Sequence, residues 1–224
     1  MNDLKENSTN VVWVNAGDFY QGTVWYTQFK WSVVSKFNNL LDFDAMTLGN
    51  HEFDDKIAGL VPFLKNQTCP FVVSNIDSSK VPEMEGLTVP SLKINRGGKV
   101  IGMVGYITPD TKFISIPEDL IFIDEIVALT AEVKKLHDEG VDIIIALGHS
   151  GYDKDIEIAA KVPHIDIVVG AHSHSFLYSP STSSENPSVE TIRGPYPTLV
   201  DNAAGHKTIV VQAYAHTKVN THDD

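Results

Sequence analysis

Four apolar runs in this chain end in glycine, or in alanine after glycine, and side chains able to bind metal or to move protons follow at once. If the runs are parallel strands of one sheet, their last residues meet at one edge, where open α/β sheets bind their ligands. Oxygen and imidazole ligands without sulfur suit Zn²⁺, Mn²⁺ or iron better than Ca²⁺. The candidate ligands are Asp18, Asn50, His149, His172 and His174.

Asp18 is the candidate best suited to join two metal ions, because a single carboxylate can bridge them. Two ions about 3.5 to 4 Å apart can stabilise both the attacking and the leaving oxygen of a phosphoryl transfer. The formal net charge of −12 means that a phosphate ester needs metal ions to offset the repulsion. The same acidity argues against a nucleic acid polymer as a partner.

His51 follows the candidate ligand Asn50 directly, and Asp54 comes three residues later. At the start of a helix, residues at this spacing share a face. A carboxylate there could orient the imidazole and hold it cationic, so that it stabilises phosphate charge or protonates a leaving alcohol. We therefore predict a His51–Asp54 catalytic dyad.

Each of these residues taken singly also has a purely structural interpretation. Asp18 could cap a helix, and Asn50 could fill a left-handed turn position. Asp54 could simply complement a helix N-terminus, and a histidine after a strand-end glycine is often only a turn residue. The joint occurrence at four strand ends is what favours a functional site.

The elements that must position these residues follow from alternating apolar runs and helical patterns. The 224 residues, 42% of them hydrophobic, suffice for one domain with a real core. Strands are expected at 11–16, 44–48, 70–74, 141–147 and 165–170, a hairpin at 88–107, and extended segments at 197–201 and 207–213. Helices are expected at 23–41, 53–64, 124–139 and 153–161. This order predicts an α/β sandwich with a largely parallel central sheet.

The expected helix at 23–41 carries aromatic and aliphatic residues four positions apart, which is typical of one buried helix face. We interpret this stripe as core rather than as a platform for stacking bases. Its members are Trp25, Phe29, Val33, Phe37, Leu40 and Leu41.

Five segments of the chain resemble the 5′-nucleotidase family of calcineurin-type metallophosphoesterases, which includes animal ecto-5′-nucleotidases and arthropod apyrases. They are NAGDFYQGTVWY, DFDAMTLGNHEFD, IIALGHSGYD, IDIVVGAHSHSFLY and VVQAYA. The resemblance runs from about residue 11 to residue 216. It implies an αββα sandwich with mixed, largely parallel central sheets, and two bound divalent ions, with Zn²⁺ expected and Mn²⁺, Co²⁺ or Mg²⁺ as alternatives.

The resemblance also implies roles for individual residues. Asp18 would bridge both ions, His174 would bind the first, and Asn50, His149 and His172 would bind the second. His51 and Asp54 match the catalytic dyad, and Asn50 and His51 would contact the substrate. The implied reaction is hydrolysis of a nucleoside monophosphate to nucleoside and phosphate. Hydrolysis of ATP and ADP is the alternative, and a non-catalytic metal- or nucleotide-binding protein is an alternative of another class.

The chain differs from the family pattern at both of its ends. Relatives begin with a strand ending in Asp-x-His, and no such motif precedes Asp18, so the first metal site is expected to be incomplete. We expect a polar segment at 1–10, a metallophosphoesterase domain at 11–216 and a tail at 217–224. The C-terminal nucleotide-recognition domain, and any homodimer formed through it, is expected outside this chain, and hydrolysis by the chain alone is expected to be impaired.

The resemblance implies an extracellular or cell-surface protein. The polar N-terminus, MNDLKENSTN, has no apolar stretch typical of a signal peptide. No run of about 18 apolar residues is present, so the sequence predicts no transmembrane segment.

Overall fold

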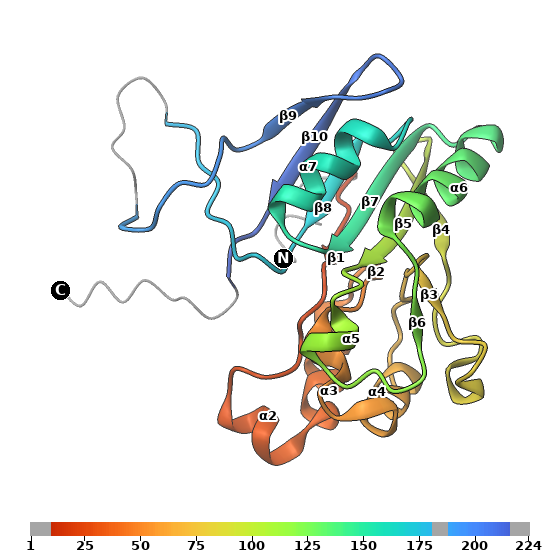
Figure 1. The fold of residues 1–224 in the computed structure, drawn as a ribbon, viewed down its shortest axis with the longest axis vertical. Coiled ribbons are helices and arrows are strands. Elements are labelled where there is room, and N and C mark those ends of the chain that lie inside the picture. Colours follow the sequence, from red (N-terminus) through yellow and green to blue (C-terminus); the bar gives the residue numbers. More distant parts are fainter. Residues whose placement is uncertain (1–9, 181–187, 216–224) are drawn as a thin grey trace.

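The larger of two stacked sheets organises the fold of this protein, which we describe from a computed structural model covering residues 10–180 and 188–215. Its strand order is β4-β5-β7-β8-β10-β9 (Figure 1). The inner strands run parallel, and the two edge strands pair antiparallel to their neighbours. The strands are β4 (Ser91–Arg96), β5 (Lys99–Ile107), β7 (Ile143–His149), β8 (Ile167–Gly170), β9 (Thr198–Asp201) and β10 (Lys207–Gln212).

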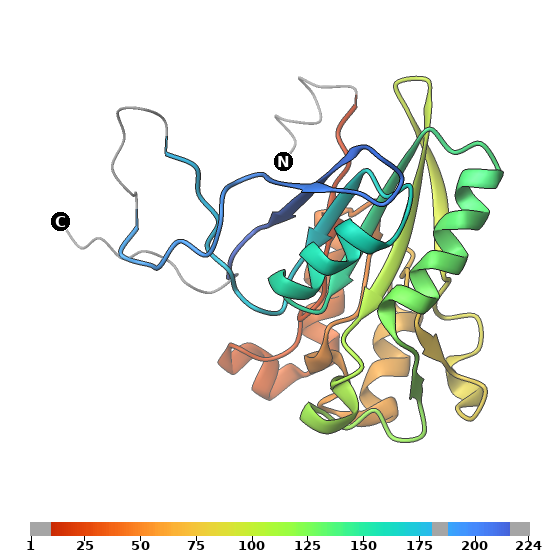
Figure 2. The same ribbon diagram turned by 45° about the horizontal axis from the view of Figure 1, so that its top comes forward.

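Helices α6 (Glu125–Asp138) and α7 (Tyr152–Lys161) cover one face of this large sheet (Figures 1 and 2). Leu129, Val133 and Leu136 of α6 are buried against Ile144 and other strand residues of that face. The helix expected at 124–139 is therefore confirmed. Helix α6 begins where the Asp124 side chain accepts a hydrogen bond from the backbone N–H of Val127.

The opposite face of the large sheet packs on a small parallel sheet of β1 (Val14–Asn15) and β2 (Ala45–Met46). Val12, Val14 and Ala16 fill the layer between the two sheets together with residues of β5, β7 and β8. Strand β7 is thus covered on both faces, which explains why its sequence is apolar without alternation.

The outer side of the small sheet is covered by a helical layer. This layer contains α2 (Val24–Phe29), α3 (Trp31–Leu41) and α4 (Lys56–Lys65), with the 3₁₀ turn η1 (Asn50–Phe53) leading into α4. The order helix, sheet, sheet, helix confirms the predicted αββα sandwich with mixed sheets. The smaller elements are β3 (Ile76–Asp77) paired with β6 (Ile121–Phe122), the 3₁₀ turn η2 (Pro82–Met84), and the short helix α5 (Thr111–Ile114).

Two expectations about the arrangement of the elements are wrong, and at 70–74 only isolated bridges from Phe71 and Val72 form where a strand was expected. The four strand ends belong to two stacked sheets instead of one, because β1 and β2 pair with each other while β7 and β8 pair within the large sheet. The stripe on 23–41 is not core. A break at Lys30, with φ 53°, divides the expected helix into α2 and α3. The stripe then faces outward, with Trp25 64% and Phe37 59% exposed.

The predicted hairpin at 88–107 is confirmed as the antiparallel pair β4–β5. The expected tail at 217–224, and all but the last residue of the polar segment 1–10, lie outside the described residues. Within 10–180 and 188–215, no helix is long and apolar enough to cross a lipid bilayer.

Candidate metal centre and catalytic dyad

Three of the predicted ligands meet where the two sheets come together. Potential ligand atoms of Asp18, His149 and His172 all lie within 4.8 Å of one another. The rings of His149 and His172 have centroids 5.2 Å apart. One residue follows β1, one ends β7 and one lies beyond β8, so the fold brings together side chains from both sheets.

Glycines let the loops after β1 and β2 touch. A Cβ at Gly49 would lie 2.2 Å from Asp18 Oδ1, and one at Gly17 would lie 2.4 Å from the backbone nitrogen of Gly49. Gly17 has φ 90°, which glycine adopts readily. Any larger residue would clash at Gly17 or Gly49, so the close approach of the two loops requires glycine before both candidate ligands.

His149 is oriented through both ring nitrogens. Its Nδ1 lies 2.6 Å from the carbonyl oxygen of Ala16 and donates to it, which leaves Nε2 facing Asp18 Oδ2 at 2.9 Å. Burial disfavours the charged form of both side chains, but in each case the interaction with the other side chain outweighs this effect. The pKa of Asp18 is lowered by His149, and the pKa of His149 is raised by Asp18.

Two buried atoms test whether a metal ion suits this centre. Asn50 Oδ1 is one of several buried side-chain atoms of the described residues that have no hydrogen-bond partner, and buried His149 Nε2 faces only the Asp18 carboxylate, at 2.9 Å. A buried polar atom without a partner costs about 1 to 3 kcal/mol. An amide oxygen, an imidazole nitrogen and the Asp18 carboxylate are donors that a divalent transition ion accepts. The residues present therefore fit a divalent metal ion.

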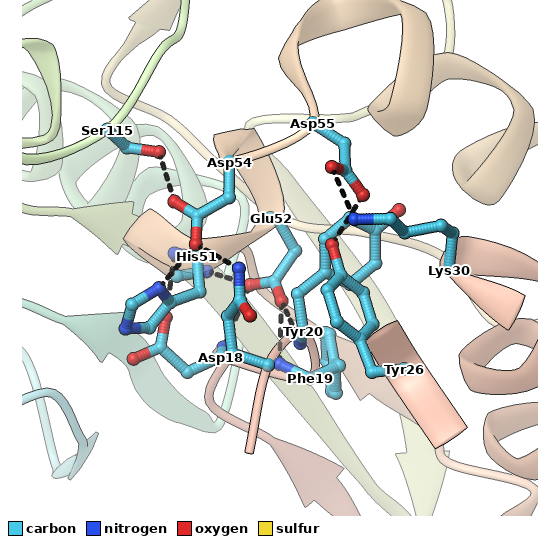
Figure 3. A network of polar contacts seen from close by, with 12 residues as sticks. Asp18, Phe19, Tyr20, Tyr26, Lys30, His51, Glu52, Asp54, Asp55 and Ser115 are labelled. Atoms are coloured by element: carbon cyan, nitrogen blue, oxygen red, sulfur yellow. Dashed lines mark hydrogen bonds and ion pairs between the residues drawn. The ribbon is translucent and has the colours of Figure 1, made fainter. Parts of the chain in front are cut away.

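His51 and Asp54 form the predicted pair. His51 Nδ1 lies 2.7 Å from Asp54 Oδ2, and the same oxygen accepts from Gln21 Nε2 at 2.7 Å (Figure 3). The other oxygen of Asp54 accepts from Ser115 Oγ at 2.7 Å. Three partners thus fix this carboxylate and, through it, the imidazole ring.

The pair is linked to the metal centre through the backbone. The N–H of His51 donates to Asp18 Oδ1 at 3.0 Å. Partial burial alone would lower the pKa of His51, but the carboxylates of Asp54 and Asp18 outweigh it and raise the pKa. The His51 side chain is 43% exposed, and because Nδ1 is engaged by Asp54, Nε2 is the nitrogen available to a ligand.

Glu52 is a residue of this site that the sequence reasoning missed. It is fully buried, and its carboxylate accepts backbone N–H groups from Asp18 at 2.8 Å, Phe19 at 2.6 Å, Tyr20 at 3.0 Å and Gly49 at 2.6 Å (Figure 3). Burial raises its pKa to about 7, while the N–H donors act in the opposite direction. The available signal was an acidic residue between His51 and Asp54, inside the same GNHEFD segment that carries the candidate site residues.

His174 is placed differently from the other predicted ligands. It has φ 47°, its side chain is exposed, and it is not one of the three residues whose ligand atoms cluster within 4.8 Å. Its role as a ligand stays a prediction.

Comparison with known proteins explains this arrangement. A profile described as calcineurin-like phosphoesterase matches residues 1–176. The chain belongs to this family. The resemblance inferred from the sequence motifs is thereby confirmed.

Relatives and a solved structure agree with this assignment. The chain is 46% identical to an apyrase of Tabanus yao over 217 residues, and 45% identical to a 5′-nucleotidase of Rattus norvegicus over 219 residues. A crystal structure of a 5′-nucleotidase precursor from Thermus thermophilus superimposes with a TM-score of 0.88 at 35% identity, covering 95% of this chain and 41% of that one. The matches cover 96% of this chain but only 39% and 37% of the two relatives.

Proposed function

We propose that this chain is the metal-binding catalytic domain of a nucleotide phosphohydrolase that converts nucleoside monophosphates to nucleoside and phosphate. The observation that carries the proposal is the convergence of Asp18, His149 and His172 next to the His51–Asp54 pair. A cluster of ligands alone would fit a binding protein. An oriented imidazole linked to that cluster through the backbone favours catalysis.

The residues have distinct parts in the proposed reaction. Asn50, His149 and His172 would hold the second of two divalent ions, His174 would bind the first, and Asp18 would serve both. Such ions, when bound, supply Lewis acidity, offset the charge of the phosphoryl group and activate water for in-line attack. Zn²⁺ is the ion we propose first, with Mn²⁺, Co²⁺ and Mg²⁺ as the others to test.

His51 would act on the substrate from beside this centre. Its Nε2 donates a hydrogen bond to a phosphoryl oxygen, while Asp54 holds the ring by Nδ1 and favours the cationic form. Asn50 contacts the substrate at the edge of the same site. Gln21 and Ser115 keep the Asp54 carboxylate in place, so the ring does not have to be oriented when substrate arrives.

The domain, its partners and its compartment are part of the proposal. Residues 11–216 form one metallophosphoesterase domain, and a nucleotide is its small-molecule partner. Specificity for the nucleoside, and any homodimer, belong to parts of the protein that the relatives have beyond the matched region. We propose an extracellular or cell-surface location from the family resemblance.

An apyrase activity on ATP and ADP is the second candidate. It has a specific basis, because the identity to the Tabanus yao apyrase, 46%, equals within one point that to the rat 5′-nucleotidase, 45%. The two activities differ in which phosphate reaches the same centre, so a direct comparison of substrates separates them.

The experiment measures phosphate release from AMP, ADP and ATP after reconstitution with each divalent ion. It uses this chain and a form extended to the length of the relatives. We expect His51→Ala to reduce hydrolysis about 100-fold or more with metal content unchanged, because general acid–base groups contribute that much. The matched control His137→Ala changes a histidine that stacks on His164, away from the centre, and should leave the rate unchanged.

Two results would contradict the proposal. One is bound metal without release of phosphate from any of the three nucleotides in either form. The other is full activity of the His51→Ala protein, which would remove the dyad from the reaction.

A further inference from the structure

The loop that carries His172 has an unfavourable backbone conformation. His172 has φ 78°, and the N–H of Ser173 donates to the carbonyl oxygen of Ala171 at 3.0 Å. A three-residue turn closed in this way around a residue with positive φ is rare and strained. Such a conformation persists only where the surrounding structure holds it in place. The residues that hold this loop therefore also determine where the His172 imidazole lies.

Gln212, at the end of β10, contacts this loop with both ends of its carboxamide. Its Nε2 donates to the carbonyl oxygen of Ala171 at 3.2 Å. Its Oε1 accepts from the backbone N–H of Ser175 at 3.2 Å and from Ser173 Oγ at 3.3 Å. One buried side chain thus binds the residues before and after His172.

Asp155 and Tyr106 fix the carboxamide in turn. Gln212 Nε2 also donates to Asp155 Oδ2 at 2.8 Å, and Tyr106 Oη donates to Asp155 Oδ1 at 2.6 Å. Both residues are fully buried. Because Gln212 Nε2 is the atom that donates to Asp155 Oδ2, this contact fixes which end of the Gln212 carboxamide faces which part of the loop.

The strand-end glycines of the large sheet make room for this network. A Cβ at Gly170 would lie 1.7 Å from Asp155 Oδ2, and one at Gly148 would lie 1.8 Å from the ring of Tyr106. These glycines stand one and two residues before the metal-ligand candidates His149 and His172. Their absence of a side chain lets Tyr106 and Asp155 reach the strand ends that carry the ligands.

We propose that Gln212, oriented by Asp155 and Tyr106, is a positioning residue for the metal ligand His172. The inference rests on the proposed function in one respect, namely that His172 binds a metal ion. Outer partners that orient a ligand typically change metal affinity about 10- to 100-fold when they are removed. Here the effect passes through the loop backbone, so it is present before any metal binds.

The alternative is that these contacts only stabilise the fold, and Asn202 provides the matched control. Asn202 is another buried carboxamide, and its Nδ2 donates to the carbonyl oxygens of Ala159 at 2.8 Å and Val162 at 2.9 Å. These contacts lie near the opposite end of α7 from Asp155. Gln212→Ala and Asn202→Ala should therefore both lower the unfolding temperature, but only the first alters the His172 loop.

The test titrates the metal-free protein with Co²⁺ and follows the electronic spectrum of the bound ion. We expect Gln212→Ala to bind Co²⁺ about 10- to 100-fold more weakly with an altered spectrum, and Asn202→Ala to bind like the unsubstituted protein. Hydrogen exchange in the metal-free state gives a second readout. The Ser175 amide should lose protection in Gln212→Ala and keep it in Asn202→Ala.

Two variants of Asp155 separate a specific bond from general packing. Asp155→Ala should weaken Co²⁺ binding as Gln212→Ala does. Asp155→Asn should restore it, because its carboxamide can accept from Gln212 and donate to Tyr106 Oη.

The outcomes distinguish the two levels of the proposal. Equal Co²⁺ affinity in Gln212→Ala and Asn202→Ala, or no restoration by Asp155→Asn, would overturn the positioning role alone. An unsubstituted protein that binds no Co²⁺ would instead overturn the proposed function, and the positioning role with it.

Discussion

The two sides of the metal centre are held by different means. On the side of the small sheet, one carboxylate, Glu52, binds four backbone N–H groups of the loops that carry Asp18 and Asn50. On the side of the large sheet, the His172 loop is held by the carboxamide of Gln212. Asp155 of α7 binds this carboxamide directly, and Tyr106 of β5 binds Asp155 in turn. The first side is fixed by a single side chain that joins two loops, and the second by a network of side chains.

This difference predicts how each side responds to removal of the metal ion and to substitution of the residues that support it. The Glu52 side joins two loops of the same small sheet, so its geometry should survive without metal. The His172 side depends on support from three separate elements, β10, α7 and β5, so small losses there should show first in metal binding. Substitutions on the two sides can test this contrast.

The largest effect is expected at Asp18, because its carboxylate contacts both sides of the centre. It faces His149 of the large sheet and accepts from the backbone N–H of His51 on the side of the small sheet. Asp18→Asn keeps the size of the side chain, and asparagine tolerates the φ of 60°. Loss of the charge should weaken metal binding by at least about 100-fold, beyond the range typical of outer partners, and hydrolysis should fall to the level of the metal-free protein. Metal content and phosphate release are the measurements.

Asp153→Asn is the control for this prediction, because Asp153 is an exposed aspartate on α7. It should leave both quantities unchanged. Retention of stoichiometric metal by Asp18→Asn would show that the remaining ligands suffice without the carboxylate.

A smaller effect, on stability, is expected at Glu52. Glu52→Gln places an NH₂ group against backbone N–H donors, so at least one buried donor loses its partner at a cost of about 1 to 3 kcal/mol. Urea unfolding of the metal-free protein measures this loss. Glu157→Gln changes a partly exposed glutamate that pairs with Lys154 and Lys161 at the surface, and the free energy of unfolding should stay within about 0.5 kcal/mol of the unsubstituted protein. Equal stability of the two variants would mean that Glu52 does not hold the loops.

The contrast between the two sides also explains what the sequence could predict. The candidate ligands and the His51–Asp54 pair were identified because they follow strand ends in the sequence, where residue type and spacing are local properties. Glu52 was missed although it lies in the same motif, because its partners at Asp18 and Gly49 become visible only when two loops are brought together. Gln212 and Asp155 lie 57 residues apart, and no sequence pattern links the two positions.

Helix α3 shows the same limit for the fold. Its apolar periodicity resembles that of α6, and only α6 buries its stripe, at Leu129, Val133 and Leu136. A break at Lys30 separates α3 from α2, and within α3 Ser35 and Asn38 are buried while Phe37 is exposed. Periodicity identifies a helix face but does not say which neighbour it meets.

The smallest expected effect is a pH dependence on the His172 side. Burial raises the pKa of Asp155 to about 7 from its ordinary value of 3.8. Between these values the unfolded chain loses a proton that the folded protein keeps, so the contribution of Asp155 to stability decreases as pH rises. Asp155→Asn removes this titration while it keeps partners for Gln212 and Tyr106. The free energy of unfolding of the variant, relative to the unsubstituted protein, should therefore increase from pH 4 to pH 7.

The measurement is urea unfolding of the metal-free protein at several pH values, with Asp153→Asn as the control. Asp153 is exposed on α7 and makes no contact with Gln212 or Tyr106, so the control should follow the unsubstituted protein. The difference for Asp155→Asn can change by at most about 1.4 kcal/mol per pH unit, the limit for one proton. A difference that stays constant with pH would mean that Asp155 is ionised throughout, and that the His172 side is held by an anion just as the Glu52 side is.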